Sequence, residues 1–476
     1  MNSRVLRSVL RSRVALVCIA VGAVTSALSV PARAEELSFP KAKARTLDNG
    51  LRVIVVEDRD IPNCALYVHW NVGSRNERPG ITGIAHMFEH MMFMGSEKYG
   101  ARFDPIMESV GGSNNAWTSR DQTVYTDWFP SSALAQILSM EADRMRGMVF
   151  DPEVVDSERG VVASERRLSM EEPVEQLREQ VWAAAYVAHP YQWDVLGWPS
   201  DIAAWTKQDL ETFFATYYTP QNALVVLVGD VDTKTALRLI EDTMGAIPSS
   251  PVTSGPVTSG PVTSGPVTPV VVTVEPEQKG ERRVTHEAPA GTLPELIALW
   301  HVPRSRHRDT PALEVLEHLL LSGESSRLHR VLVDEQELCL SVGGGLQGLQ
   351  FDASVFAVEC TLREGGETAN VERLVYAELA RIATDGPTDA ELSAAIAKLR
   401  VRFLRRLRTI DGKAELIGET AVFFGTWRML PWRLEAIQNV SGDDVKRVAA
   451  HYFRKRNRTV GTLDIAIASA SEDKAE

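Results

Sequence analysis

Residues 86, 89 and 90 have the types and the spacing that metal-dependent catalysis requires. His86, Glu89 and His90 form the pattern His-x-x-Glu-His. At about 100° per residue, the three side chains would lie within an arc of roughly 100° on one helix face. Two imidazoles one turn apart can bind one zinc ion, and the carboxylate between them can act on a water molecule. Alone, the pattern is equally compatible with a surface helix that carries two histidines.

A zinc site needs a third protein ligand, and a downstream helix offers two candidates. Asp151 followed by Pro152 is typical of a helix start, and this helix is expected to run to about Ser169. Glu158 and Glu165 are seven residues apart, which places them on one helix face to within about 20°. One of them could complete the metal site while the other supports it. Without the histidines, the pair would indicate only a solvated face.

The elements that must position these residues indicate an α+β protein. An Asn49-Gly50 turn joins an earlier strand to the first clear one. Alternating or continuous apolar runs predict strands at 51–57, 65–72 and 223–228, and one strand over 115–128. Helical spacing and cap residues predict helices at 83–94, at 151–169 and at 209–218.

The first 34 residues are interpreted as an export signal. Four arginines precede an apolar run over 14–30, which is followed by Pro-Ala-Arg-Ala. This order is typical of a secretory signal cut after Ala34, and the alternative is an uncleaved anchor. Removal of the segment would change the net charge from −12 to −17. We therefore expect a periplasmic protein with neither nucleic acid as a partner nor stable insertion in a membrane.

Repeats of Pro-Val-Thr-Ser-Gly from Pro251 onward divide the mature chain. Such a composition is typical of a linker, so the predicted parts are a signal at 1–34, a zinc-binding domain at 35–250, a linker at 251–280 and a second domain at 281–476. The second domain repeats the first faintly. His86 to Gly95 is echoed by Glu314 to Gly323, and residues 209–222 are echoed by 444–457. Two echoes at offsets of 228 and 235 indicate a duplicated domain without a second metal site.

Four motifs in order resemble the insulinase-like zinc metallopeptidases, the pitrilysin and mitochondrial-processing-peptidase type. They are HMFEHMMFMGSEKYG, GGSNNAWTSRDQTVY, ERGVVASER and YYTPQNALVVLVGDVD. The resemblance covers essentially the whole mature chain and is strongest before the repeats. It implies two homologous domains, each a mostly antiparallel sheet flanked by helices, which form half of a clamshell.

The resemblance also implies a role for each site residue. His86, His90 and Glu165 match the ligands of one zinc ion per chain, and Glu89 matches the general base that acts on a zinc-activated water. Glu158 matches a supporting glutamate of the catalytic site. The residues that match substrate-binding positions are Asn115 and Ala116 on an edge strand, and Trp117 and Phe93 in a pocket, where core packing is the alternative.

One part of the family pattern is missing. Relatives have an Arg and a Tyr seven residues apart in the second domain, where this chain has Val333 and Leu340. Apolar side chains cannot stabilise an oxyanion. The resemblance therefore implies a heterodimer with a homologous subunit that lacks His-x-x-Glu-His and supplies the Arg/Tyr pair. A homodimer is the alternative.

Composition and cysteine content reduce the number of protein classes that fit this sequence. With 44% hydrophobic and 24% charged residues, the chain is typical of a folded protein. After signal removal Cys64, Cys339 and Cys360 remain without a CxxC pair, which supports neither a disulfide scaffold nor a cysteine zinc site. We expect a periplasmic zinc metalloendopeptidase that hydrolyses peptides or unfolded segments. The alternatives are a non-catalytic homologous subunit for peptide binding or assembly, and a zinc-dependent binding module.

Overall fold

The computed structural model describes residues 39–249 and 269–465, which contain two β-sheets. We call residues 39–249 the first half and residues 269–465 the second half. The predicted signal at 1–34 and the Pro-Val-Thr-Ser-Gly repeats lie outside the described residues, and the predicted domain boundaries stay a prediction. No helix of the described residues is long and apolar enough to cross a membrane.

The first sheet has six strands in the order β1-β2-β6-β3-β5-β4. Only β2 and β6 are parallel, so the sheet is mostly antiparallel. Strand β4 forms one edge. The strands are β1 (Lys43–Thr46), β2 (Arg52–Glu57), β3 (Asn63–Trp70), β4 (Ser113–Thr118), β5 (Thr123–Pro130) and β6 (Ala223–Gly229).

The second sheet repeats five of these positions in the order β7-β11-β8-β10-β9. Again one pair, β7 with β11, is parallel, and β9 is the edge that corresponds to β4. The strands are β7 (Arg282–Ala288), β8 (Glu295–Val302), β9 (Cys339–Leu346), β10 (Ser354–Leu362) and β11 (Arg458–Ile465). The equal order and direction confirm the two homologous domains.

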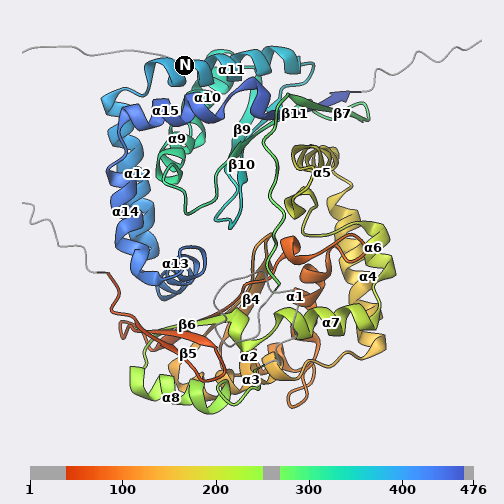
Figure 1. The fold of residues 1–476 in the computed structure, drawn as a ribbon, viewed down its shortest axis with the longest axis vertical. Coiled ribbons are helices and arrows are strands. Elements are labelled where there is room, and N and C mark those ends of the chain that lie inside the picture. The colour runs from red at the N-terminus through yellow and green to blue at the C-terminus, as the bar shows by residue number, and fades with distance from the viewer. Residues whose placement is uncertain (1–38, 250–268, 466–476) are drawn as a thin grey trace, which may run out of the picture. The chain divides into compact units, whose positions relative to one another are not determined.

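Helices flank both sheets (Figure 1). In the first half they are α1 (Ile84–Met94), α2 (Phe103–Ser109), α3 (Leu134–Arg146), α4 (Pro152–Ser169), α5 (Pro173–Ala185), α6 (Pro199–Ala204), α7 (Lys207–Tyr217) and α8 (Thr233–Thr243). In the second half they are α9 (Thr310–Leu321), α10 (Arg327–His329), α11 (Thr368–Asp385), α12 (Asp389–Arg406), α13 (Ile410–Phe423), α14 (Leu430–Gln438) and α15 (Gly442–Tyr452).

Two helices pack on the sheet of the other half. Helix α5 packs on β7 and β11, where Val181 joins an apolar cluster with Ile297 and Leu463. Helix α13 packs on β3 and β6, and Gly418 of α13 lies against the His69 ring of β3. Each half therefore buries apolar surface of the other, and this exchange was not predicted from the sequence.

The second sequence echo corresponds to a shared structural role. Asn222 donates from Nδ2 to the Tyr217 carbonyl oxygen over 2.8 Å. Asn457 donates in the same way to the carbonyl oxygen of Tyr452, also over 2.8 Å. In both halves this bond holds the end of a helix, α7 or α15, at the start of the following strand. An asparagine at the equivalent position thus makes the same hydrogen bond in both halves, as expected of a duplicated domain.

The prediction of one strand over 115–128 was wrong. The segment contributes to two antiparallel strands, β4 and β5, joined by a tight turn at residues 119–122. Ser119 N donates to the Gln122 carbonyl oxygen over 2.8 Å, and Ser119 Oγ accepts from Gln122 N over 3.1 Å. The polar alternation continues through the turn, so periodicity alone did not reveal the reversal. The other predicted strands and helices occur within two residues of the expected bounds.

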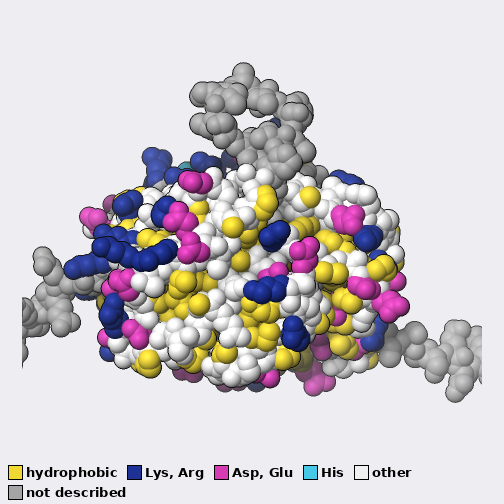
Figure 2. Space-filling model, turned by 90° about the horizontal axis from the view of Figure 1, so that it is seen from below, with side chains coloured by type: hydrophobic (Ala, Val, Ile, Leu, Met, Phe, Trp, Pro, Cys, Tyr) yellow, Lys and Arg dark blue, Asp and Glu magenta, His cyan; other side chains and the backbone are white. Residues whose placement is uncertain are grey.

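The surface over the first sheet's helices carries charges of both signs. In Figure 2 acidic, basic and apolar side chains are interspersed on this face of the molecule. An extended basic surface of the kind that binds nucleic acid is therefore not present on the face drawn there.

Candidate metal centre

Helix α1 carries both histidines because its sequence is apolar around them and its ends are set by glycine. Ile84, Met87 and Met91 are fully buried beneath the helix. Gly83 precedes α1 with φ of +84°, which a residue with a side chain rarely adopts. Gly95 ends the helix. The spacing of four residues between His86 and His90 then places their rings 4.8 Å apart, centre to centre.

A buried glutamate holds the first turn of α1. Glu77 accepts from Gly83 N with one carboxylate oxygen and from Ala85 N with the other, each over 2.9 Å. Asp201 of α6 accepts in turn from Gly80 N and Thr82 N in the preceding loop. Glu77 and Asp201 were not predicted as site residues. Both contact backbone N–H groups of an irregular loop, and the spacing of residues in the sequence does not predict the path of such a loop.

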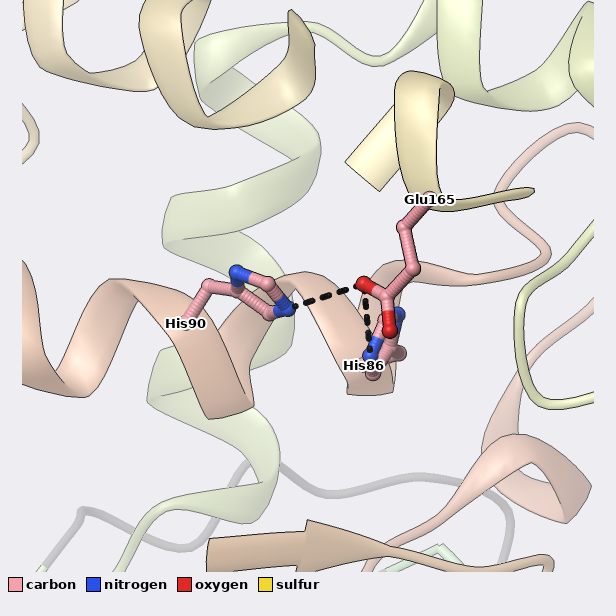
Figure 3. Close-up of side chains that lie close together, drawn as sticks. All are labelled: His86, His90 and Glu165. Atoms are coloured by element: carbon pink, nitrogen blue, oxygen red, sulfur yellow. Dashed lines mark ion pairs between the residues drawn. The ribbon is translucent and has the colours of Figure 1, made fainter. Parts of the chain in front are cut away.

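Glu165 reaches the two histidines from a different helix, α4 (Figure 3). Its Oε2 lies 3.7 Å from His86 Nε2 and 3.5 Å from His90 Nε2. One potential ligand atom from each of the three residues lies within 4.8 Å of the others. No other group of three or more histidine, cysteine or acidic residues with this closeness occurs in the described ranges.

The donor set fits zinc. Two imidazole nitrogens and one carboxylate oxygen are the protein ligands of a catalytic zinc site with an open fourth position. Burial lowers the pKa of His86, which keeps its imidazole neutral near pH 7 and able to bind a metal. His86 is 7% exposed, whereas the Glu165 side chain is 50% exposed, so the site is open on the glutamate side.

The second glutamate of α4 lies behind one histidine. Glu158 Oε2 is 3.5 Å from His90 Nδ1, the ring nitrogen on the side opposite Glu165. A carboxylate in this position orients the ring and favours the tautomer whose Nε2 is free to bind a metal. Glu89 lies between the histidines on α1 and is half-buried. The structure thus groups the five predicted residues on two adjacent helices, α1 and α4.

The predicted substrate-binding residues divide between two faces of the sheet. Asn115, Ala116 and Trp117 lie on the edge strand β4, as expected. Phe93 packs beside Tyr125 with ring centres 5.8 Å apart, on the α1 side. The Trp117 ring lies 6.2 Å from that of Tyr67, on the side of the sheet facing α13. Phe93 and Trp117 are therefore not brought together.

The two positions where the family resemblance leads us to expect an Arg/Tyr pair carry the apolar residues Val333 and Leu340. Val333 lies in a π-helical segment (Arg330–Glu335) and packs against the core of the second half. Leu340 lies on the edge strand β9 and is 50% exposed. The nearby Arg327 is buried and paired with Glu378 and Glu391, so it cannot replace the missing arginine.

Family models match both halves of the chain. Residues 52–197 match the model described as insulinase (peptidase family M16). Residues 204–399 match the model described as peptidase M16 inactive domain.

Several known proteins are similar over most of the chain. A zinc protease named PqqE from Helicobacter pylori is 31% identical over 426 residues, 88% of this chain and 92% of that protein. The crystal structure of a protease from Helicobacter pylori matches with a TM-score of 0.83 at 29% identity, over 90% of this chain and all of that one. A probable mitochondrial-processing peptidase subunit beta from Arabidopsis thaliana is 28% identical over 218 residues, 46% of this chain and 41% of its own.

Proposed function

The chain belongs to the insulinase family of peptidases, family M16, and we propose that it is a zinc metalloendopeptidase that hydrolyses peptides or unfolded polypeptide segments. The observation that carries this proposal is the cluster of His86, His90 and Glu165, with their ligand atoms within 4.8 Å of one another. A zinc ion held by these groups would supply Lewis-acid chemistry for attack on a peptide carbonyl. Zinc proteases among the relatives support this choice of metal.

The other residues of the site act on protons and on the substrate. Glu89 would take a proton from the attacking water and deliver it to the leaving amine. Glu158 would orient His90 through Nδ1. The free edge of β4 at Asn115 and Ala116 would bind an extended peptide by backbone hydrogen bonds, as an added strand. Phe93 and Trp117 would contact side chains of the peptide.

The direct test is Glu89→Gln, which removes the base and keeps the shape of the side chain. We expect zinc content equal to that of the unchanged protein and hydrolysis of an unstructured peptide reduced by a factor of about 100 to 10,000. Glu97→Gln, at an exposed position just beyond α1, is the matched control and should leave both unchanged. Full activity of Glu89→Gln would refute the assignment. Zinc without chelator-sensitive cleavage in the unchanged protein would indicate a peptide-binding subunit.

We further propose that the active form includes a homologous subunit that lacks His-x-x-Glu-His. Val333 and Leu340 stand where relatives have the Arg/Tyr pair, and relatives that are named as subunits support an assembly. Mass spectrometry of proteins that co-purify with the chain should identify such a subunit, and mixing the two should raise peptide hydrolysis. Full activity of the purified chain as a monomer or homodimer would refute the heterodimer.

The proposed location is the periplasm, with residues 1–34 as a cleaved signal. The proposed division of the mature chain is a zinc-binding domain at 35–250, a linker at 251–280 and a second domain at 281–476. One structural relative is described as the periplasmic protease PqqL from Escherichia coli, and its 19% identity with a TM-score of 0.68 supports the fold alone. Sequencing of the mature N-terminus should begin at Glu35 in the periplasmic fraction. Recovery of the protein with its intact N-terminus in the cytoplasm would contradict both the cleavage after Ala34 and the periplasmic location.

A further inference from the structure

The second half repeats the two-helix framework of the metal centre. Helix α9 follows β8 and precedes the edge strand β9, as α1 follows β3 and precedes β4. In the echo of the motif, Glu314, Glu317 and His318 stand in the places of His86, Glu89 and His90. Helix α12 corresponds to α4, and both helices have 18 residues.

The charges in this second framework differ from those of a metal centre. Arg402 is the fourteenth residue of α12, and Glu165 is the fourteenth residue of α4. A guanidinium group therefore replaces the carboxylate ligand, and it has no lone pair to offer a cation. Burial lowers the pKa of the buried His318, and Lys398 and Arg402 lower it further, so a proton on this ring is disfavoured. The second framework therefore has no set of three metal ligands among the described residues, and it carries both acidic and basic side chains.

Residues of helices α9, α12, α13 and α14 line a cavity of about 300 Å³ at this framework. The four helices are labelled in Figure 1. Its wall is apolar at Leu346, Leu399 and Leu416, among others. Into the same space face six charged side chains of both signs, namely Glu314, Glu317, Glu419, Arg402, Arg406 and Arg433.

Several of these charges form no ion pair within the described residues, and Glu314 and Arg433 attract each other only beyond ion-pair distance. Glu314 makes no hydrogen bond or ion pair, and Glu317 accepts only from Leu346 N, over 3.1 Å. Arg433 donates to Thr420 Oγ1 over 2.7 Å and lies over the Phe424 ring, but it pairs with no carboxylate. Arg402 also makes no ion pair. By contrast, Arg406 is paired with Glu415 and Glu419.

Glu314, Glu317 and Arg433 are half-buried, whereas Arg402 is exposed at the rim of the cavity. Half-buried charges without an ion-pair partner destabilise the protein unless something in the cavity compensates them. Burial raises the pKa of Glu314 and lowers the pKa of Arg433, so each side chain is held in surroundings that disfavour its charge. Burial also raises the pKa of Glu317 to about 7. A ligand with one positive and one negative group would compensate both sides at once.

We propose that this cavity binds a small zwitterion, an α-amino acid or dipeptide with apolar side chains, whose ammonium lies beside Glu314 and Glu317 and whose carboxylate lies beside Arg433 and Arg402. The volume is at the lower end of known ligand pockets and matches a small ligand. The apolar wall selects a side chain such as that of leucine. Peptide hydrolysis releases molecules of this class, but the site shares no residue with the metal centre of the first half.

Calorimetric titration of the full chain with L-leucine and with leucyl-leucine tests the proposal. The Glu89→Gln background prevents cleavage of the dipeptide, and a second titration after chelator treatment removes metal from the first half. We expect saturable binding of one molecule per chain, unchanged by the chelator. N-acetyl-leucine and leucinamide should each bind at least about tenfold more weakly, because each leaves the charges on one side of the cavity uncompensated.

Variants locate the site. Glu314→Gln and Arg402→Met should each weaken binding at least about tenfold. Arg400→Met is the matched control, because Arg400 is exposed on the same helix and does not line the cavity. Glu314→Gln removes a half-buried charge that forms no ion pair, so the melting temperature of this variant should equal or exceed that of the unchanged protein. This comparison separates lost binding from lost folding.

Three results would overturn the proposal. The first is absence of saturable binding of both probes at millimolar concentration. The second is equal binding of the blocked analogues, which would show that charge recognition is absent. The third is binding that Glu314→Gln and Arg402→Met leave intact while Glu165→Gln or chelator abolishes it, which would place the ligand at the metal centre.

Discussion

Two glutamates of α4, seven residues apart, have different surroundings at the candidate metal centre. The Glu165 side chain is 50% exposed and faces the Nε2 atoms of both histidines. The Glu158 side chain is 11% exposed and faces only Nδ1 of His90. Sequence spacing alone could not assign their roles, since both lie on one helix face. The difference in depth supports Glu165 as the ligand and Glu158 as the supporting group.

Substitution of each glutamate by glutamine should separate these roles. Glu165→Gln removes the anionic ligand, so we expect loss of most bound zinc. Glu158→Gln should retain zinc but weaken its binding about 10- to 100-fold, because it acts only through His90. Zinc content and competition with a chelator measure both effects. Glu171→Gln, at an exposed position after α4, should change neither. A greater loss of zinc in Glu158→Gln than in Glu165→Gln would reverse the assignment.

A second residue-level property is a fully buried histidine on β3. Burial lowers the pKa of His69 to about 4, from an ordinary value of 6.5. Its Nδ1 lies 3.3 Å from Gln122 Oε1, and its Nε2 has no partner among the described residues. Between pH 6.5 and 4 the unfolded chain therefore binds a proton that the folded chain excludes.

This histidine should make stability depend on pH. Its contribution is fully present above pH 6.5 and is lost as the pH falls toward 4, by about 3 kcal/mol in total. Denaturant unfolding should be measured at several pH values between 6.5 and 4. The free energy of unfolding should fall less steeply with pH in His69→Asn, by a slope that corresponds to close to one bound proton. His451→Asn, at an exposed position, should follow the unchanged protein. An equal slope in His69→Asn and the unchanged protein would contradict the expectation.

At the scale of elements, α1 depends on a contact outside the helix. The carboxylate oxygens of Glu77 accept from the N–H of Gly83, which precedes the helix, and from the N–H of Ala85, the residue before His86. Glu77 is 5% exposed, so no water can substitute fully for a lost bond. The position of His86 is therefore coupled to the loop that holds Glu77.

Glu77→Gln should weaken zinc binding although Glu77 is not one of the proposed zinc ligands. The amide offers one acceptor and places its NH₂ group against a backbone N–H, so the first turn loses one bond. We expect zinc to bind about 10- to 100-fold more weakly, measured by competition with a chelator. Glu153→Gln is the matched control, since Glu153 is exposed in the first turn of α4. Unchanged zinc affinity in a folded Glu77→Gln protein would show that α1 positions His86 unaided.

At the scale of the whole molecule, the halves are joined by the helices that each packs on the other's sheet. The closest approach is at Gly418 of α13, where an added Cβ would lie 2.0 Å from His69 Nε2. Lys413, one turn earlier, forms an ion pair with Asp58 of the first half. This junction tolerates no side chain at position 418.

Gly418→Ala should therefore destabilise the protein despite the better helix propensity of alanine. Overpacking of this kind lowers the free energy of unfolding by about 1–3 kcal/mol. Gly160→Ala is a matched control inside α4, because its Cβ would meet no atom within 4 Å, and it should be neutral or stabilising. Thermal and denaturant unfolding compare the two. A Gly418→Ala protein as stable as Gly160→Ala would show that α13 can move away from β3.

The sequence by itself determined the local features of this protein. The motif at His86, the capped helix with Glu158 and Glu165, and the two echoes follow from spacing along one chain, because helix and strand periods are local properties. The family followed from four ordered motifs. Turns hidden in a continuous alternation, such as residues 119–122, were missed because periodicity does not mark a reversal.

Only the tertiary structure decided which distant side chains meet. It showed the different depths and neighbours of Glu165 and Glu158, placed Glu77 at the start of α1 and separated Phe93 from Trp117 across the sheet. It also showed that α5 and α13 each cover the sheet of the other half. These contacts join residues far apart in the chain, and their geometry depends on how helices pack on sheets. No local periodicity encodes that packing, and so the depth of a charge or the face of a ring could not be derived from residue spacing.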